Sequence, residues 1–230
     1  MSTFSEIPEL SGVSIVVIGR FNPLIFSPRW LRDNDLISVE AADGADIEII
    51  HQDICDFVVE QVHVQVTENR LSIGSAHPAA RSVARDLAVG ALSVLEHTPI
   101  RVFGLNTDQH FRMPSVDEWH AVGHHFAPKD DWGDILEDPG TRVVEMLGRL
   151  PGTSAYSVNV RLEPSRQIRP GVYFRINQHY SLQDDEEVDA SADGYDFTVN
   201  RLVECITKDW DEFLAFSSRV PLHLLKAALK

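Results

Sequence analysis

Strict alternation of apolar and polar residues in three stretches constrains the fold of this chain more than any other feature. The stretches are residues 62–67, 155–162 and 171–182, where valine, leucine, isoleucine and aromatic residues recur at every second position over most of the length. Side chains along a β-strand point alternately to the two faces of the sheet, so this pattern predicts strands with one buried face. Such one-sided strands are typical of antiparallel sheets that expose their other face to water.

Glycine and proline divide the rest of the chain into short elements. We predict a helix at 27–36, where Ser27 caps the helix and Pro28 opens it, and another at 115–126, where Ser115 and Glu118 form a capping box. Further helices are predicted from their apolar stripes. The remaining predictions are strands at 13–21, 45–52, 56–67, 70–75, 100–106 and 141–150, helices at 77–97 and 196–214, a separate short helix that Pro221 starts, and acidic loops at 127–140 and 183–194.

Residues 1–97 and 98–230 show the same predicted order of strand, short helix, three strands and long helix. Matching residues lie near the end of the first strand of each half and after it: Gly19 and Gly104, Asn22 and Asn106, Phe26 and Phe111, Trp30 and Trp119. Repeats of this kind decide the architecture of a chain. We therefore predict an α+β fold of two similar halves, each β-α-β-β-β-α and the second followed by a C-terminal helix. The halves are expected to pack as one pseudo-symmetric unit, with a mostly antiparallel sheet and the long helices on one face.

This element order resembles the TATA-binding-protein-like fold, which is a tandem of strand–helix–strands–helix units. The resemblance covers most of the chain, depends on element order without a sequence motif, and leaves one strand fewer in each half. It implies a long curved sheet. It does not imply DNA binding, because DNA-binding members of that fold present a basic concave face with apolar wedges, and this chain is acidic.

The charge and the cysteine content exclude several classes of protein. The chain has 230 residues and a formal net charge of −15, so it repels phosphate backbones and anionic membrane surfaces, and direct binding to a nucleic-acid backbone is not expected. The only cysteines, Cys55 and Cys205, are far apart in sequence and are expected to be buried packing residues of a protein in a reducing compartment. We find no signal peptide and no apolar run long enough to span a bilayer. These features predict a bacterial-type cytoplasmic protein.

The polar face of the predicted sheet is the first candidate site. Hydrogen-bonding side chains and several arginines would line it, which is compatible either with a solvated outer face or with a docking surface for a protein partner or an anionic ligand. The residues assigned to this face are His63, Gln65, Thr67, Ser72, Arg101, Ser157, Asn159, Arg161, Glu163, Tyr173, Arg175, Asn177 and His179.

The histidines of residues 117–125, DEWHAVGHH, are the second candidate site. His120 and His124 are one helical turn apart, a spacing that suits zinc, and His110 or Asp108 could be a third ligand. The pattern lacks the glutamate that follows the first histidine in zincins, so ordinary surface histidines are the alternative. The acidic loop 127–140 lacks the order of an EF-hand and is expected to be solvated, with Trp132 buried beneath it as an anchor.

These observations lead to three functional hypotheses. The first is a non-catalytic cytoplasmic adaptor or accessory subunit without a cofactor, which binds another protein or a second copy of itself through the polar sheet face. The second is a metal-dependent hydrolase that uses His120, His124 and His110 or Asp108. The third is an acidic mimic of nucleic acid that blocks DNA-binding proteins. The chain contains no GxSxG, Walker, GxGxxG or kinase motif.

Overall fold

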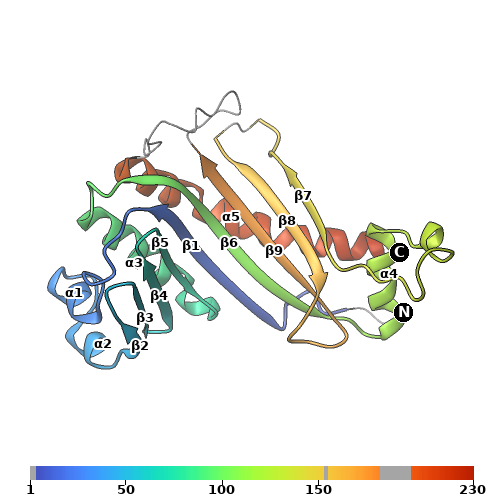
Figure 1. The fold of residues 1–230 in the computed structure, drawn as a ribbon, viewed down its shortest axis with the longest axis horizontal. Helices are drawn as coiled ribbons and strands as arrows, with labels where there is room; N and C mark the ends of the chain where they lie inside the picture. Colours follow the sequence, from blue (N-terminus) through green and yellow to red (C-terminus); the bar gives the residue numbers. More distant parts are fainter. Residues whose placement is uncertain (1–3, 153–154, 182–197) are drawn as a thin grey trace.

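The computed structural model describes residues 4–152, 155–181 and 198–230, and it confirms an α+β fold with an antiparallel sheet (Figure 1). The described residues form one sheet of nine strands in the order β2-β3-β4-β5-β1-β6-β9-β8-β7. The strands are β1 (Leu10–Gly19), β2 (Asp46–Ile50), β3 (Ile54–Val59), β4 (Val62–Thr67), β5 (Arg70–Ser75), β6 (Ile100–Arg112), β7 (Val144–Gly148), β8 (Ser157–Pro164) and β9 (Gly171–Ser181). The helices are α1 (Pro28–Asp33), α2 (Val39–Asp43), α3 (Arg81–Val94), α4 (Val116–Phe126) and α5 (Val199–Ala228), with short 3-10 turns η1 (Pro78–Ala80) and η2 (Asp130–Trp132).

The two central strands, β1 and β6, pair along most of their length. The ladder runs from Leu10 opposite His110 to Gly19 opposite Ile100, with one register shift near its end. From this pair the sheet grows outwards in two directions, because β5 pairs with β1 on one side and β9 pairs with β6 on the other. β1, the first strand of residues 1–97, and β6, the first strand of residues 98–230, therefore lie at the centre of the sheet. Each lies beside the last strand of its own part of the chain, β5 or β9.

Alternating side chains of the sheet form the main core together with α3 and α5. Val13, Ile15 and Val17 of β1 are buried in one cluster with Val62, Val64 and Val66 of β4, as the period of two predicts. Helix α3 contacts β1, β4 and β5, and α5 contacts β6, β9 and α3. Figure 1 shows α5 running behind β6, β9 and β8. A second, smaller cluster joins the ends of β6, β8 and β9 to α4 and the last turns of α5.

Helix α5 runs unbroken from Val199 to Ala228, so the prediction of a separate helix starting at Pro221 is wrong. A proline inside a helix has no N–H to donate to the carbonyl four residues earlier, which here belongs to Ser217. The side chain of Gln109, buried in β6, donates from Nε2 to this carbonyl oxygen at 2.9 Å. The strand therefore supplies the hydrogen bond that Pro221 removes, and the helix continues. None of the helices that the described residues form is long and apolar enough to cross a membrane.

The stretch 56–67, predicted as one strand, is two strands joined by a tight turn. Glu60 and Gln61 both have positive φ, 47° and 67°, and the hairpin closes with Val59 opposite Val62. Two-residue hairpin turns with positive φ at both positions normally carry asparagine or glycine, and Glu-Gln gives no such signal. As a result the first part of the chain has four strands after its helices, where three were expected.

Other boundaries and one burial prediction also differ. Strand β6 extends to Arg112, well past the predicted end at residue 106. In this extension Thr107, Gln109 and His110 are buried although they are polar, so no alternation of apolar and polar residues marks the strand in the sequence. Strand β7 is shorter than predicted, and Trp132 is 50% exposed, so its role as a buried anchor is wrong. Cys55 is buried as predicted and Cys205 is partly buried. The predicted acidic loop 183–194 lies outside the described residues.

The bond between Gln109 and Ser217 can be tested with a double-mutant cycle. We expect Gln109→Met, which keeps the volume and removes the donor, to lower the free energy of unfolding by about 1–3 kcal/mol, because a buried carbonyl loses its partner. In a Pro221→Ala background the helix itself supplies an N–H to Ser217, so the same substitution should cost clearly less. Urea unfolding of the four proteins gives both values. Equal costs in the two backgrounds would contradict this account of the helix.

Candidate functional site

The predicted polar-face residues fall into two separated groups. Residues from β8 and β9 lie opposite each other in pairs, with Asn159 beside Asn177 and Arg161 beside Arg175. His63 and Gln65 lie on β4, which is separated from β9 by β5, β1 and β6. Arg101 is exposed next to the register shift of β6, far along the strand from Asp108.

A hydrogen-bonded centre on β6 and β9 dominates the group that lies on β8 and β9. The Tyr173 hydroxyl donates to Oδ1 of Asp108, and Nε of Arg175 lies 3.2 Å from the same oxygen. Burial raises the pKa of Tyr173 well above its usual value, and the hydrogen bond to Asp108 raises it further. Tyr173 is therefore a neutral hydrogen-bond donor at physiological pH. Asp108, a possible third metal ligand in the sequence, accepts these hydrogen bonds and so orients Tyr173 and Arg175.

The neighbouring polar side chains are also paired, both between strands and, for Arg161 and Glu163, within β8. Nδ2 of Asn177 donates to Oδ1 of Asn106 at 2.8 Å, and NH2 of Arg161 lies 2.8 Å from Oε2 of Glu163 and NH1 lies 3.6 Å from Oε2 of Glu145. On β4, Nε2 of His63 lies 2.6 Å from Oδ1 of Asp56 on β3, and Gln65 donates to the other oxygen of Asp56 at 2.7 Å. The face is thus a set of oriented donors and acceptors.

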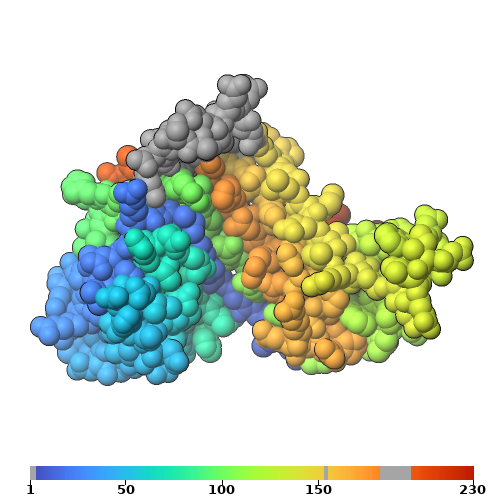
Figure 2. Space-filling view, in the orientation of Figure 1, coloured from blue at the N-terminus to red at the C-terminus, as the bar shows by residue number. Residues whose placement is uncertain are grey.

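Two hollows lie at the end of this face. The first, which we call the face cleft, has a volume of about 770 Å³ and lies between residues 8–12, the end of β6 and strands β8 and β9. Asp108, Tyr173 and Arg175 line it. In Figure 2 the surface is hollowed between the teal side of the molecule, where β4 and β5 lie, and the orange side, where β9 lies. In the polar centre the side chains of Arg175 and Asp108 are 55% and 37% exposed, so the centre is accessible from outside.

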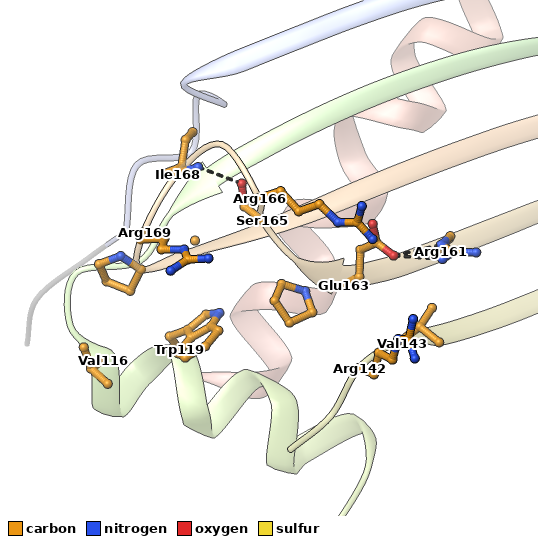
Figure 3. A pocket seen from close by; sticks show the side chains of 13 residues that line it. Val116, Trp119, Arg142, Val143, Arg161, Glu163, Ser165, Arg166, Ile168 and Arg169 are labelled. Carbon is orange, nitrogen blue, oxygen red and sulfur yellow. Dashed lines mark hydrogen bonds and ion pairs between the residues drawn. The ribbon is translucent and has the colours of Figure 1, made fainter. Parts of the chain in front are cut away.

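The second hollow, which we call the arginine pocket, has a volume of about 660 Å³ and lies between α4, the start of β7, the end of β8 and the loop 165–170. Four arginines line it, accompanied by one tryptophan and several aliphatic side chains. Figure 3 shows Trp119 on α4 facing the loop that carries Ser165 to Arg169, with Arg161 and Glu163 on the β8 side. Its lining consists of Val116, Trp119, Arg142, Val143, Arg161, Glu163, Pro164, Ser165, Arg166, Ile168, Arg169, Pro170 and Gly171.

His110 holds the loop of the arginine pocket in place. Its Nδ1 lies 2.8 Å from Oγ of Ser165, and that oxygen also accepts hydrogen bonds from the backbone N–H groups of Gln167 and Ile168 at 3.2 and 3.0 Å. With both N–H groups pointing at Oγ, the Ser165 hydroxyl is left to donate to Nδ1 of a neutral His110. Burial lowers the pKa of His110, although the charges of Asp108 and Glu163 oppose the shift. His110 thus anchors the loop.

The other predicted metal ligands lie on α4 and do not come together with His110. Nε2 of His124 lies 3.5 Å from Oδ2 of Asp130, and the ring of His120 lies 5.0 Å from that of Trp119. Within residues 4–152, 155–181 and 198–230, no three histidine, cysteine or acidic side chains are grouped so that they could hold one metal ion. The zinc hypothesis stays a prediction, as does the nucleic-acid mimic.

Sequence reasoning missed most of the arginine pocket. Arg142, Arg166 and Arg169 belong to no sequence motif, and Trp119 stands out in the sequence only as the counterpart of Trp30. In the structure Trp119 lines the pocket and packs against the smaller core cluster. The segment RLEPSRQIR, residues 161–169, carries three arginines between two alternating strands and was the available signal. What the sequence could not show was that α4 and β7 would face this segment.

No protein-family model matches the sequence of this chain, and no curated protein matches it significantly.

Buried His110 and half-buried His179 predict how stability depends on pH. Burial lowers the pKa of both His110 and His179, so the unfolded chain binds more protons than the folded chain near the usual histidine pKa of about 6.5. The contribution of these two histidines to the free energy of unfolding should therefore be fully present above this pH and should fall as the pH decreases through it. Urea unfolding at pH 7.5 and pH 5.5 measures the loss, and a His110→Gln, His179→Gln double variant should lose less. An equal loss in both proteins would contradict the assignment.

Proposed function

We propose that the protein is a non-catalytic cytoplasmic adaptor or accessory subunit that binds another protein through the polar face of its sheet. The observation that carries this proposal is the centre formed by Asp108, Tyr173 and Arg175, which opens into the face cleft. Arginine and tyrosine are enriched at the energetic centres of protein interfaces. Because Asp108 already orients both side chains, a partner would meet a preformed surface, and less entropy would be lost on binding.

The arrangement of the sheet supports this proposal further. We propose that the chain arose by internal duplication and that both long helices cover one face, which leaves the opposite face for the partner. In support, β1 and β6 occupy equivalent central places, each flanked by the last strand of its own part. The buried apolar side chains of α3 and those of α5 from Val199 to Phe213 also belong to one core cluster. The unequal strand numbers of the two parts are a divergence from strict repetition.

The Ser165 and His110 pair does not favour an enzyme. A nucleophilic serine needs an accessible oxygen and a base that can accept its proton while the oxygen attacks. Ser165 is buried, and its oxygen already accepts two backbone hydrogen bonds that shape the loop. The pair is therefore interpreted as a structural anchor.

Charge reversal at the centre tests the proposal. Arg175→Glu places a carboxylate beside Asp108 and removes the guanidinium, so the amount of partner that co-purifies from the native host should fall at least about tenfold. Arg29→Glu is the matched control, because Arg29 is an exposed arginine on α1 with the same charge change. Quantitative mass spectrometry of the tagged proteins measures the ratio. The proposal is contradicted if both variants retain the partner equally. It is also contradicted if neither the wild type nor the variants capture a partner.

A further inference from the structure

We propose that the arginine pocket binds a small phosphate ester that carries a flat aromatic ring, the chemistry of a nucleotide. This inference goes beyond the docking of a protein on the sheet face, because the ligand is small and the pocket lies beside that face. A volume of about 660 Å³ is within the usual range of about 300–1,000 Å³ for small-molecule sites. The charge, the rigidity and the apolar wall of the pocket support this inference.

The charge of the pocket is opposite to that of the whole protein. The pocket and its edge contain four guanidinium groups and two carboxylates, Glu163 in the wall and Glu145 beside Arg161. This leaves a surplus of two positive charges in a chain of net charge −15. In the part of the chain that the structure describes, Arg142, Arg166 and Arg169 take part in none of the ion pairs. Arginine binds phosphate oxygens with paired, charge-assisted hydrogen bonds. A phosphate dianion matches this surplus.

The loop that carries two of the arginines is fixed from several sides. The Ser165 hydroxyl holds its start, and Ile168 is buried at its middle. NH1 of Arg112 donates to the carbonyl of Arg169 at 3.0 Å, and the N–H of Met113 donates to that of Pro170 at 3.0 Å. Because the backbone is held in this way, Arg166 and Arg169 lose less freedom when they bind a ligand than they would on a loose loop.

Gly171 shows how closely this loop is packed. A Cβ atom at this position would lie 2.7 Å from the carbonyl oxygen of Ile168, nearer than such atoms come in proteins. Only glycine therefore allows the loop to return to β9 at this point.

The opposite wall suits a flat apolar group. Trp119 faces the loop from α4, and Val116, Val143 and Pro164 also line the pocket. An indole offers a stacking surface for an aromatic ring, and aromatic side chains stack on every kind of nucleic-acid base. An inorganic anion would leave this wall unused, whereas a nucleotide occupies both the arginines and the apolar wall.

Isothermal titration of the purified protein with ATP, inorganic tripolyphosphate and adenosine tests the inference. We expect ATP to bind most tightly, tripolyphosphate less tightly and adenosine least. Arg142→Ala and Arg169→Ala should each raise the dissociation constant for ATP at least about tenfold, which corresponds to about 1.4 kcal/mol. Trp119→Leu should weaken the binding of ATP but not the binding of tripolyphosphate, because it removes only the stacking surface. Thermal unfolding of each variant verifies that it is folded.

A control variant tests whether binding depends on this pocket. Arg29→Ala removes an exposed arginine elsewhere and should leave ATP binding unchanged. The inference is overturned if ATP does not bind at millimolar concentration, or if Arg29→Ala weakens binding as much as Arg169→Ala. Equal affinity for ATP and tripolyphosphate would also overturn it. None of these results depends on the capture of a protein partner.

Discussion

The antiparallel ladder between β1 and β6 is the interaction on which the rest of the structure depends. It joins residues about ninety positions apart. On their other edges β1 pairs with β5 and β6 pairs with β9, the last strand of each part of the chain. The ladder also makes the core continuous, because Val13 and Ile15 of β1 are buried in the same cluster as Phe103 and Leu105 of β6. Without this pairing each part would have an open sheet edge with unpaired N–H and C=O groups.

The side of β6 that faces α5 shows how a polar residue can be part of a core. Gln109 is buried, and its amide supplies the hydrogen bond that the helix lacks at Ser217 because of Pro221. A buried amide and a buried proline would each destabilise the structure alone, since one would lack a partner and the other would leave a carbonyl unpaired. Together they fix the position of α5 along the sheet, and the last turns of α5 in turn complete the small core beneath α4.

The net charge and the local charges of this protein act over different distances. The field of a chain with a net charge of −15 repels anions at long range. That field is screened within about 10 Å at moderate salt, whereas the four arginines of the pocket act at contact distance. Net charge therefore excludes binding to extended polyanions more strongly than it excludes a small anion that enters a shaped pocket. The sharing of Arg161, Glu163 and Arg166 between pocket and cleft also means that an occupant of one hollow would alter the wall of the other.

The sequence by itself determined the fold class, most strands and the helix caps, because these depend on neighbouring residues. The alternation in 62–67, 155–162 and 171–182 predicts which side chains are buried, and Ser27 and Ser115 cap helices as expected. Only the tertiary structure decided the turn at Glu60 and Gln61, the continuity of α5 through Pro221, and the meeting of Arg142, Trp119 and Arg169 around one pocket. The physical reason is that the helix and the pocket depend on partners distant in sequence, which a local pattern does not reveal, and that Glu60 and Gln61 are not residues typical of such a turn.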